Sequence, residues 1–154
     1  MKPIIIHGLR GSGNSQKAIL GCSLLGLQYL LKEPTALWGK AATEPGGAKS
    51  PEFLAISPRG LIPVIEDPNF IQADGSAGVI LHDSIAILSY LSSRYQAKWY
   101  PINDALRLAK VNYWLGFAAG DIQHTLLKVS LIYIFFFLEV CIYYVATDLG
   151  PYWQ

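Results

Sequence analysis

Cysteine is scarce in this sequence, which contains only Cys22 and Cys141. The two lie far apart and show no CxxC or CxxH spacing, which argues against both a disulfide framework and a zinc site. Disulfides belong to oxidising compartments, so this low cysteine content fits a reducing setting. We therefore expect a cytoplasmic protein that holds no metal ion.

The sequence also lacks an excess of either charge. Twelve Lys and Arg residues oppose eleven Asp and Glu residues, which gives a formal net charge of +1. Nucleic-acid-binding domains usually carry a strongly basic patch or stripe, so we expect no nucleic-acid partner. The three histidines share no metal or triad spacing with a serine or cysteine. Gly11-Ser12-Gly13 lacks the GxGxxG form of a nucleotide-binding loop.

A long hydrophobic run is missing from the N-terminus, where the apolar segment is too short for the core of a signal peptide. One long apolar stretch lies near the other end, where residues 126–146 carry only Lys128 and Glu139 as charges. A transmembrane helix needs about 20 predominantly apolar residues and tolerates an internal Glu poorly. We therefore expect no membrane association, and a membrane anchor is the weaker alternative. Our hypothesis is that this stretch is aberrant sequence in a truncated product.

The first part of the chain has the pattern of a βαβ unit. Residues 4–7 form a continuous apolar run closed by Gly8, which is typical of a buried central strand. After a Gly/Ser loop, apolar residues recur at helical spacing (Ala18, Ile19, Cys22, Leu25), and this spacing makes Cys22 a core residue rather than a nucleophile. Gly26 can end that helix, and residues 28–31 are suited to a second, parallel strand.

Residues 33–50 form a long connection without periodicity, for which the sequence indicates at most a turn of helix around 35–40. Ser50 and Pro51 then have the residue types of an N-cap and a first helical position. Pro63 precedes an apolar pair and cannot donate to a sheet ladder, so it belongs at the entry to a strand over residues 64–66.

The following residues predict a hairpin and a helix. Turn clusters at 67–69 and 73–76 precede a partner strand over 79–82. From Ser84, apolar residues recur at helical spacing up to Tyr95, which predicts a helix that packs on the sheet. Residues 96–104 indicate a linker, and a new helix is expected over roughly 105–118.

Four segments in this order resemble the cytosolic glutathione transferases, and within them the plant phi class and the fungal branch that includes the yeast nitrogen-catabolite regulator. These segments are residues 6–17, 49–54, 57–69 and 82–91. The resemblance implies an α/β fold, with a thioredoxin-like N-terminal domain of a mixed four-stranded sheet and helices, followed by a truncated all-α segment. It places the glutathione-binding domain at 1–95, a linker at 96–104 and a partial helical domain at 105–154.

The resemblance also implies a binding site for glutathione. The ligand's α-carboxylate suits the free N–H groups and positive dipole at the start of the helix that begins at Ser84, with Asp83 beside the ligand's ammonium. Ile62, before a Pro63 expected to be cis, would pair with the cysteinyl backbone. Lys49 would meet the glycyl carboxylate. A plain N-cap for Asp83 and Ser84, and an exposed loop lysine for Lys49, are the alternatives.

Two residues are the candidates for catalysis. Ser12 matches the phi-class catalytic serine, and Asn14 matches the asparagine that fungal relatives place near the sulfur. A thiol with a pKa of about 8.5 is only slightly ionised at neutral pH, and one hydrogen bond to a thiolate contributes roughly 1.5 to 3 kcal/mol. One well-placed hydroxyl is therefore enough to promote thiolate formation. The alternative is that Ser12, Asn14 and Ser15 only cap the helix.

The resemblance therefore implies an enzyme that binds glutathione as co-substrate and promotes attack of its thiolate on a small electrophile, in detoxification or secondary metabolism. It allows a homodimer. The alternative is a non-catalytic glutathione-binding or regulatory module, or an inactive truncated product. Two departures from the family pattern favour the alternative: Ala48 replaces a histidine, and Asp83 replaces the more usual Glu.

Overall fold

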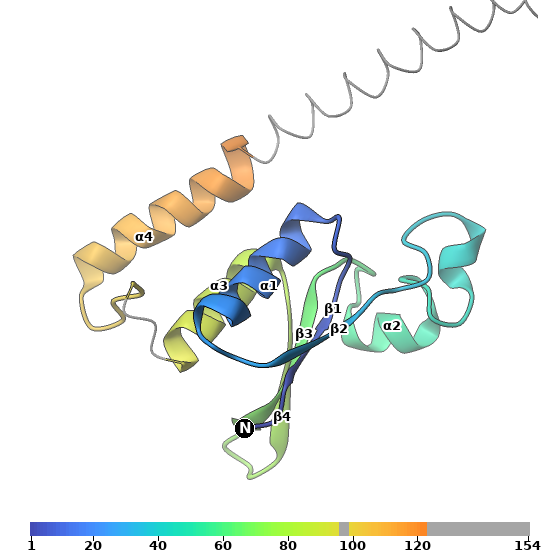
Figure 1. The fold of residues 1–154 in the computed structure, drawn as a ribbon, viewed down its shortest axis with the longest axis horizontal. Coiled ribbons are helices and arrows are strands. Elements are labelled where there is room, and N and C mark those ends of the chain that lie inside the picture. The colour runs from blue at the N-terminus through green and yellow to red at the C-terminus, as the bar shows by residue number, and fades with distance from the viewer. Residues whose placement is uncertain (96–98, 123–154) are drawn as a thin grey trace, which may run out of the picture. The chain divides into compact units, whose positions relative to one another are not determined.

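A computed structural model of the chain describes residues 1–95 and 99–122 (Figure 1). The sheet has the strand order β2-β1-β3-β4, formed by β1 (Ile4–His7), β2 (Tyr29–Lys32), β3 (Val64–Ile71) and β4 (Ala77–His82). β1 is parallel to β2 and antiparallel to β3, and β3 is antiparallel to β4. The predicted mixed four-stranded sheet is confirmed, with β1 in its interior.

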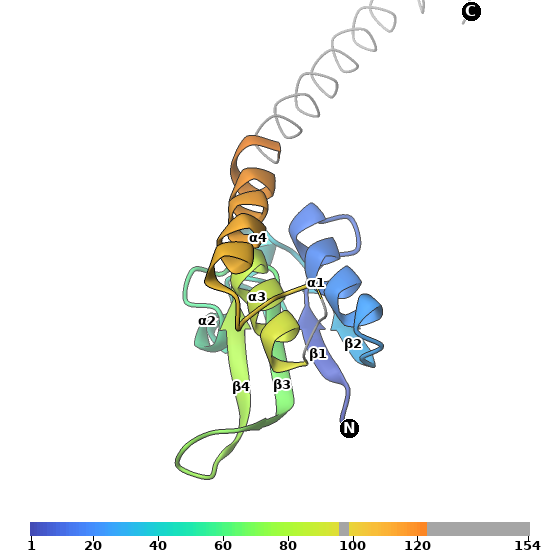
Figure 2. The same ribbon diagram turned by 90° about the vertical axis from the view of Figure 1, so that its left-hand side faces the viewer.

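Helices cover both faces of this sheet. α1 (Gly13–Leu24) and α3 (Ser84–Arg94) lie side by side on one face, and α2 (Pro51–Ile56) lies on the other (Figures 1 and 2). The two neighbouring helices approach closely because α1 carries Gly21, where a Cβ would lie only 2.9 Å from Leu88 Cδ2. The order of elements is thus βαβ followed by ββα.

The predicted start of α2 is confirmed in detail. Ser50 is the N-cap, and its hydroxyl accepts a hydrogen bond from the Phe53 N–H at 3.3 Å. Pro51 occupies the first helical turn, where its missing N–H costs nothing. The cap therefore marks the point where the long connection after β2 ends and α2 begins.

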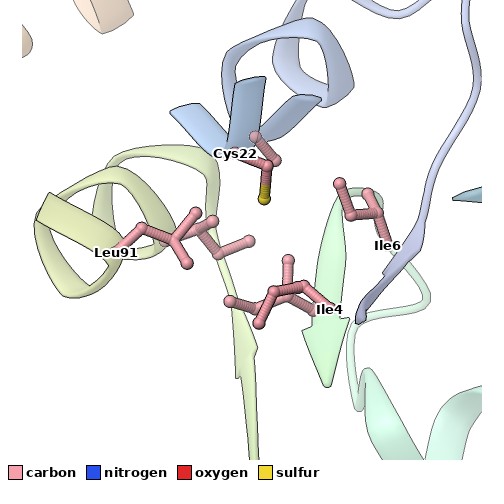
Figure 3. Packing of buried hydrophobic residues seen from close by; sticks show 7 residues of the cluster. Ile4, Ile6, Cys22 and Leu91 are labelled. Atoms are coloured by element: carbon pink, nitrogen blue, oxygen red, sulfur yellow. The ribbon is translucent and has the colours of Figure 1, made fainter. Parts of the chain in front are cut away.

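The main core lies between the sheet and the α1/α3 pair (Figure 3). Its buried members are Ile4, Ile6, Ala18, Cys22, Ile65, Ile87 and Leu91. Full burial of one isoleucine or leucine side chain stabilises the fold by about 1.5–3 kcal/mol. Burial, together with the nearby Asp67 carboxylate, raises the pKa of the Cys22 thiol to about 11. Cys22 is therefore a protonated core residue, as predicted.

The prediction that β1 is buried on both faces was wrong. Ile4 and Ile6 are buried, but Ile5 and His7 between them are only half-buried. They point to the face that α2 covers in part, where the His7 ring meets Phe53 edge-on at 6.0 Å between centroids. His7 Nε2 also lies 2.6 Å from Glu66 Oε1.

β3 is longer than predicted, because it continues through the expected turn at 67–69. Asp67 is fully buried and accepts hydrogen bonds from the hydroxyls of Tyr90 at 2.7 Å and Tyr95 at 2.8 Å. Pro68 is tolerated because the pairing with β4 shifts register between Asp67 and Ile71, and an irregularity of this kind accommodates a residue without an N–H. The predicted turn at 73–76 is confirmed as the tip of the hairpin.

The connection after β2 differs from the prediction in one respect. Its helical turn is the 3-10 helix η1 (Lys40–Thr43), not a turn over 35–40. Gly39 precedes it with φ of 73°, a left-handed conformation that favours glycine. The helical turn therefore begins after this glycine and not before it.

A further helix, α4 (Ala105–Phe117), confirms the helix predicted at about 105–118 and continues as the π-helical turn η2 (Ala118–Ile122). Three of its aromatic rings contact one another, those of Tyr113, Trp114 and Phe117. None of the helices within 1–95 and 99–122 is long and apolar enough to cross a bilayer. The apolar stretch 126–146 lies outside the described residues.

Candidate functional site

Three loops meet at one end of the sheet because of its topology. Val64, the first residue of β3, pairs with His7 at the end of β1 and with His82 at the end of β4. The loop that follows β1, the Ile62-Pro63 turn and the start of α3 therefore emerge at the same end. Polar residues on these segments can act on one ligand.

The loop after β1 leads into α1 through Ser12. Ser12 is the N-cap of α1, and its Oγ accepts a hydrogen bond from the Ser15 N–H at 3.4 Å. A hydroxyl can accept and donate at once, so this cap leaves the Ser12 O–H able to donate to a ligand. Ser15, which the sequence offered only as a capping candidate, is buried, and its Oγ accepts a hydrogen bond from the Leu9 N–H at 3.1 Å. It fixes the shape of the loop.

Asn14 connects the two helices. Its Oδ1 accepts a hydrogen bond from Ser84 Oγ, the first residue of α3, at 3.3 Å. The same oxygen accepts from Lys17 Nζ at 3.0 Å. Asn14 and Ser84 were predicted to share one site, and the structure brings them into contact across 70 positions of sequence. Lys17 was not predicted.

Asp83 caps α3. Its Oδ1 accepts hydrogen bonds from the N–H groups of Ile85 at 2.9 Å and Ala86 at 3.0 Å. Among the described residues other than glycine, only Asp83 has a positive φ, at 79°. The N-cap alternative is therefore realised in the structure, and it takes two of the donors that open this helix.

Lys49 is held against the turn that leads to Pro63. Its Nζ donates to the Arg59 carbonyl at 2.7 Å. Gly60 makes this approach possible, because a Cβ there would lie 2.6 Å from Lys49 Cδ and 2.5 Å from the Ala48 carbonyl oxygen. Lys49 is therefore a positioned, half-buried residue and not a freely exposed loop lysine.

The Ile62-Pro63 bond is cis, as predicted. Pro63 is buried, and Ile62 is half-buried beside it. Within the described ranges, the N–H and C=O of Ile62 take part in none of the backbone hydrogen bonds of turns and loops. The main chain before the proline can therefore pair with an extended ligand backbone.

The other titratable groups do not add to this site. His82 ends β4 as an exposed residue, which fits the expected strand-end histidine. No three His, Cys, Asp or Glu side chains among residues 1–95 and 99–122 gather closely enough to hold a metal ion. The donor set of the site consists of hydroxyls, an amide, backbone groups and a lysine, and such groups suit an anionic organic ligand rather than a cation.

A βαβ and ββα arrangement with a cis-proline before its third strand defines the thioredoxin-like class of domains. Comparison with known proteins narrows this class. The family described as "Glutathione S-transferase, N-terminal domain" matches residues 6–99. The chain belongs to this family.

Individual relatives agree with this assignment. Human glutathione S-transferase theta-2 is 40% identical over 82 residues, which cover 52% of this chain and 30% of the relative. A glutathione transferase homolog from Lodderomyces elongisporus, solved with two GSH per subunit, is 31% identical with a TM-score of 0.63. The match covers 80% of this chain and 55% of the chain of that structure.

A theta class glutathione S-transferase from Xanthomonas axonopodis pv. citri, solved with glutathione bound, is 28% identical with a TM-score of 0.60. This match covers 78% of the present chain and 50% of that structure. The chain thus spans about half the length of these solved structures and under a third of the human relative.

Proposed function

We propose that this chain binds glutathione at the sheet end described above and promotes attack of its thiolate on a small electrophile. The observation that carries the proposal is the hydrogen bond between Asn14 Oδ1 and Ser84 Oγ. It joins the turn proposed to face the sulfur to the helix end proposed to bind the α-carboxylate. The glutathione named in the titles of the two solved relatives supports the choice of ligand.

Each part of glutathione has a proposed partner. The α-carboxylate lies at the start of α3, near Ser84, with Asp83 beside the ammonium. The cysteinyl backbone pairs with Ile62 before cis-Pro63, and the glycyl carboxylate meets Lys49. In the reaction the thiol loses its proton to water, and the thiolate sulfur forms a bond to an electrophilic carbon. Where that carbon carries a leaving group, the group departs with the bonding electron pair.

Ser12 and Asn14 are the proposed catalytic residues, because both can donate a hydrogen bond to a thiolate. We also propose the phi-like or fungal branch of the family, which the Lodderomyces relative supports. The division into domains at 1–95 and 105–154, a homodimer, a cytoplasmic location, and a role in detoxification or secondary metabolism belong to the same proposal.

A non-catalytic glutathione-binding module is the second candidate. It is favoured by Asp83, whose carboxylate caps α3. Both candidates bind glutathione. They differ in whether the bound glutathione then reacts with an electrophile.

Calorimetry of the purified chain with glutathione, followed by an assay with a general electrophile such as an activated chloroarene, tests both candidates. Binding with glutathione-dependent turnover is the result expected for the enzyme. Binding without turnover would identify the module. Absence of binding would contradict both.

A substitution at Gly60 tests the proposed role of Lys49. The Gly60→Ala variant is expected to bind glutathione about tenfold more weakly, which corresponds to about 1.4 kcal/mol. The reason is that the new Cβ would lie 2.5 Å from the Ala48 carbonyl oxygen and 2.7 Å from Lys49 Nζ, so the segment that holds Lys49 has to shift. Titration calorimetry measures the loss.

Gly75→Ala is the matched control. Gly60 and Gly75 both have positive φ, at 58° and 84°, so an alanine at either one is strained by about 1–2 kcal/mol. A Cβ at Gly75 meets nothing within 4 Å. Equal affinity for glutathione in the two variants would show that Lys49 is not a ligand contact.

A further inference from the structure

Lys17 lies on α1 one turn after Asn14 and is half-buried. Its ammonium donates to Asn14 Oδ1 at 3.0 Å. Burial lowers the pKa of Lys17, and the negative charge of Asp83 acts in the opposite direction and favours the protonated form. Lys17 is thus an ammonium beside residues from both helices that form the proposed site.

The ammonium determines how the amide of Asn14 is turned. An ammonium has donors and no acceptor, so the side of the amide that faces Lys17 has to be its oxygen. The Ser84 hydroxyl donates to the same oxygen at 3.3 Å. With Oδ1 held by two donors from two helices, Nδ2 is directed away from both of them.

An Asn14 amide held in this way can only donate at its remaining end. A thiolate accepts hydrogen bonds, and it would be repelled by the carbonyl oxygen of an amide turned the other way. Without Lys17, both orientations of the amide become accessible, since the Ser84 hydroxyl can also accept a hydrogen bond.

We infer that Lys17 is a positioning residue, which fixes the Asn14 amide so that its nitrogen faces the sulfur of bound glutathione. This inference rests on the proposed function. It assigns to Lys17 no contact with the ligand, so its effect should fall on ionisation of the thiol and not on affinity for glutathione.

The experiment is a pH titration of the thiolate absorbance of glutathione bound to the full chain, with calorimetry of the same samples. The Lys17→Met variant keeps the apolar stem and removes the donors. Its bound thiol is expected to titrate about one pH unit higher, which lowers the thiolate fraction about tenfold at a pH well below its pKa. Glutathione affinity at a pH where the thiol is protonated should change less than about threefold. Lys17→Arg retains donors and should restore the wild-type titration.

Two further variants make the result specific. Lys2→Met removes a lysine near the opposite end of β1 and should leave the titration unchanged. Asn14→Asp keeps the oxygen for Lys17 and Ser84 but lacks the amide nitrogen, so it should raise the thiol titration at least as much as Lys17→Met. If Lys17→Met fails to fold, an unchanged titration in Asn14→Asp would still overturn the inference.

The outcomes separate the two levels of the proposal. Absence of glutathione binding by the wild-type chain would overturn the proposed function and this inference together. Binding with an unchanged titration in Lys17→Met, or in Asn14→Asp, would overturn the role of Lys17 alone. A titration that Lys17→Arg fails to restore would also count against it.

Discussion

Replacement of Ser12 by alanine is expected to lower the rate of glutathione conjugation by about 10- to 150-fold, with little change in affinity for glutathione. A hydrogen bond to a charged acceptor contributes about 1.5–3 kcal/mol, and each 1.4 kcal/mol is a factor of ten. The Ser12 O–H is able to provide that bond because the cap uses only its oxygen, as acceptor for the Ser15 N–H.

The measurement is kcat/KM as a function of pH. Loss of the thiolate's hydrogen bond should move the acid limb of the profile to higher pH by one to two units. The same substitution also removes the cap of α1, which costs about 1 kcal/mol of stability. Assays are therefore to be run well below the unfolding temperature of the variant.

Ser12→Thr is the matched control, since threonine keeps both the hydroxyl and the ability to cap a helix. It should retain most of the activity. If Ser12→Ala and Ser12→Thr were equally active, Ser12 would be only a cap, and Asn14 would remain as the proposed donor to the sulfur.

The Asp67→Asn variant is expected to lose about 1.5–3 kcal/mol of unfolding free energy at neutral pH, the contribution of a hydrogen bond to a charged group. Asp67 is fully buried and receives hydrogen bonds from Tyr90, Tyr95 and Asn69. An asparagine carries no charge and its N–H₂ group can only donate, so the charge-assisted hydrogen bonds are lost or replaced by weaker neutral ones. Urea unfolding measures the difference.

The pH dependence of that difference follows from the same contacts. Burial acts to raise the pKa of Asp67, but the hydrogen bonds from Tyr90, Asn69 and Tyr95 outweigh it and hold the pKa below 3.8. A carboxyl with a lowered folded-state pKa contributes stability that is present above the unfolded pKa and lost as pH falls through the folded value. The wild-type chain should therefore lose stability below about pH 4, and Asp67→Asn should lose less.

At alkaline pH, stability depends on the two tyrosines and falls as pH rises. Burial first, and then the bond to Asp67, raise the pKa of Tyr90 and bring that of Tyr95 to about 12. A tyrosine with a raised folded-state pKa contributes stability below its unfolded value of 10.0, which is lost as pH rises through the folded value. Tyr95→Phe should weaken this loss of stability at alkaline pH.

On the acid side, wild type and Asp67→Asn should differ. If both lost stability equally as pH fell, Asp67 would not be the source of the acid dependence.

Local signals in the sequence were enough to predict most elements of the fold. The strand at β1, the Ser50-Pro51 start of α2 and the helix that begins at Ser84 were each predicted from residues close together in the sequence, and each is confirmed. The cis bond before Pro63 is different. It followed from resemblance to a family, because the residues around a proline do not by themselves decide its isomer.

The errors arose where contacts between distant residues outweigh local preference. Asp67-Pro68-Asn69 has the composition of a turn, yet β3 continues through it because Tyr90 and Tyr95 of the α3 region satisfy a buried carboxylate. No pattern near Asp67 contains this information. Lys17 was overlooked for a similar reason, since a lysine on a helix is usually solvated and only the approach of α3 gives it a role.

In the candidate site, too, the sequence predicted which residues take part but not how distant residues contact one another. Ser12, Asn14, Lys49, Ile62, Pro63, Asp83 and Ser84 were named from motifs, and their roles toward glutathione remain predictions. The motifs could not show that Asp83 uses its carboxylate to cap α3, or that Gly60 holds Lys49 in place. These relations depend on where the backbone turns, which the residue types alone do not specify.

The hydrogen bond from Ser84 to Asn14 also has a consequence for folding. It is one of the bonds that join the βαβ half of the domain to its ββα half. A ligand that contacts both helix ends would act as a reversible cross-link between these halves, because it binds only when they have docked. By linkage, ligand at 100 times its Kd would add about 2.7 kcal/mol to their association. Binding of such a ligand and completion of the fold are in that sense one equilibrium.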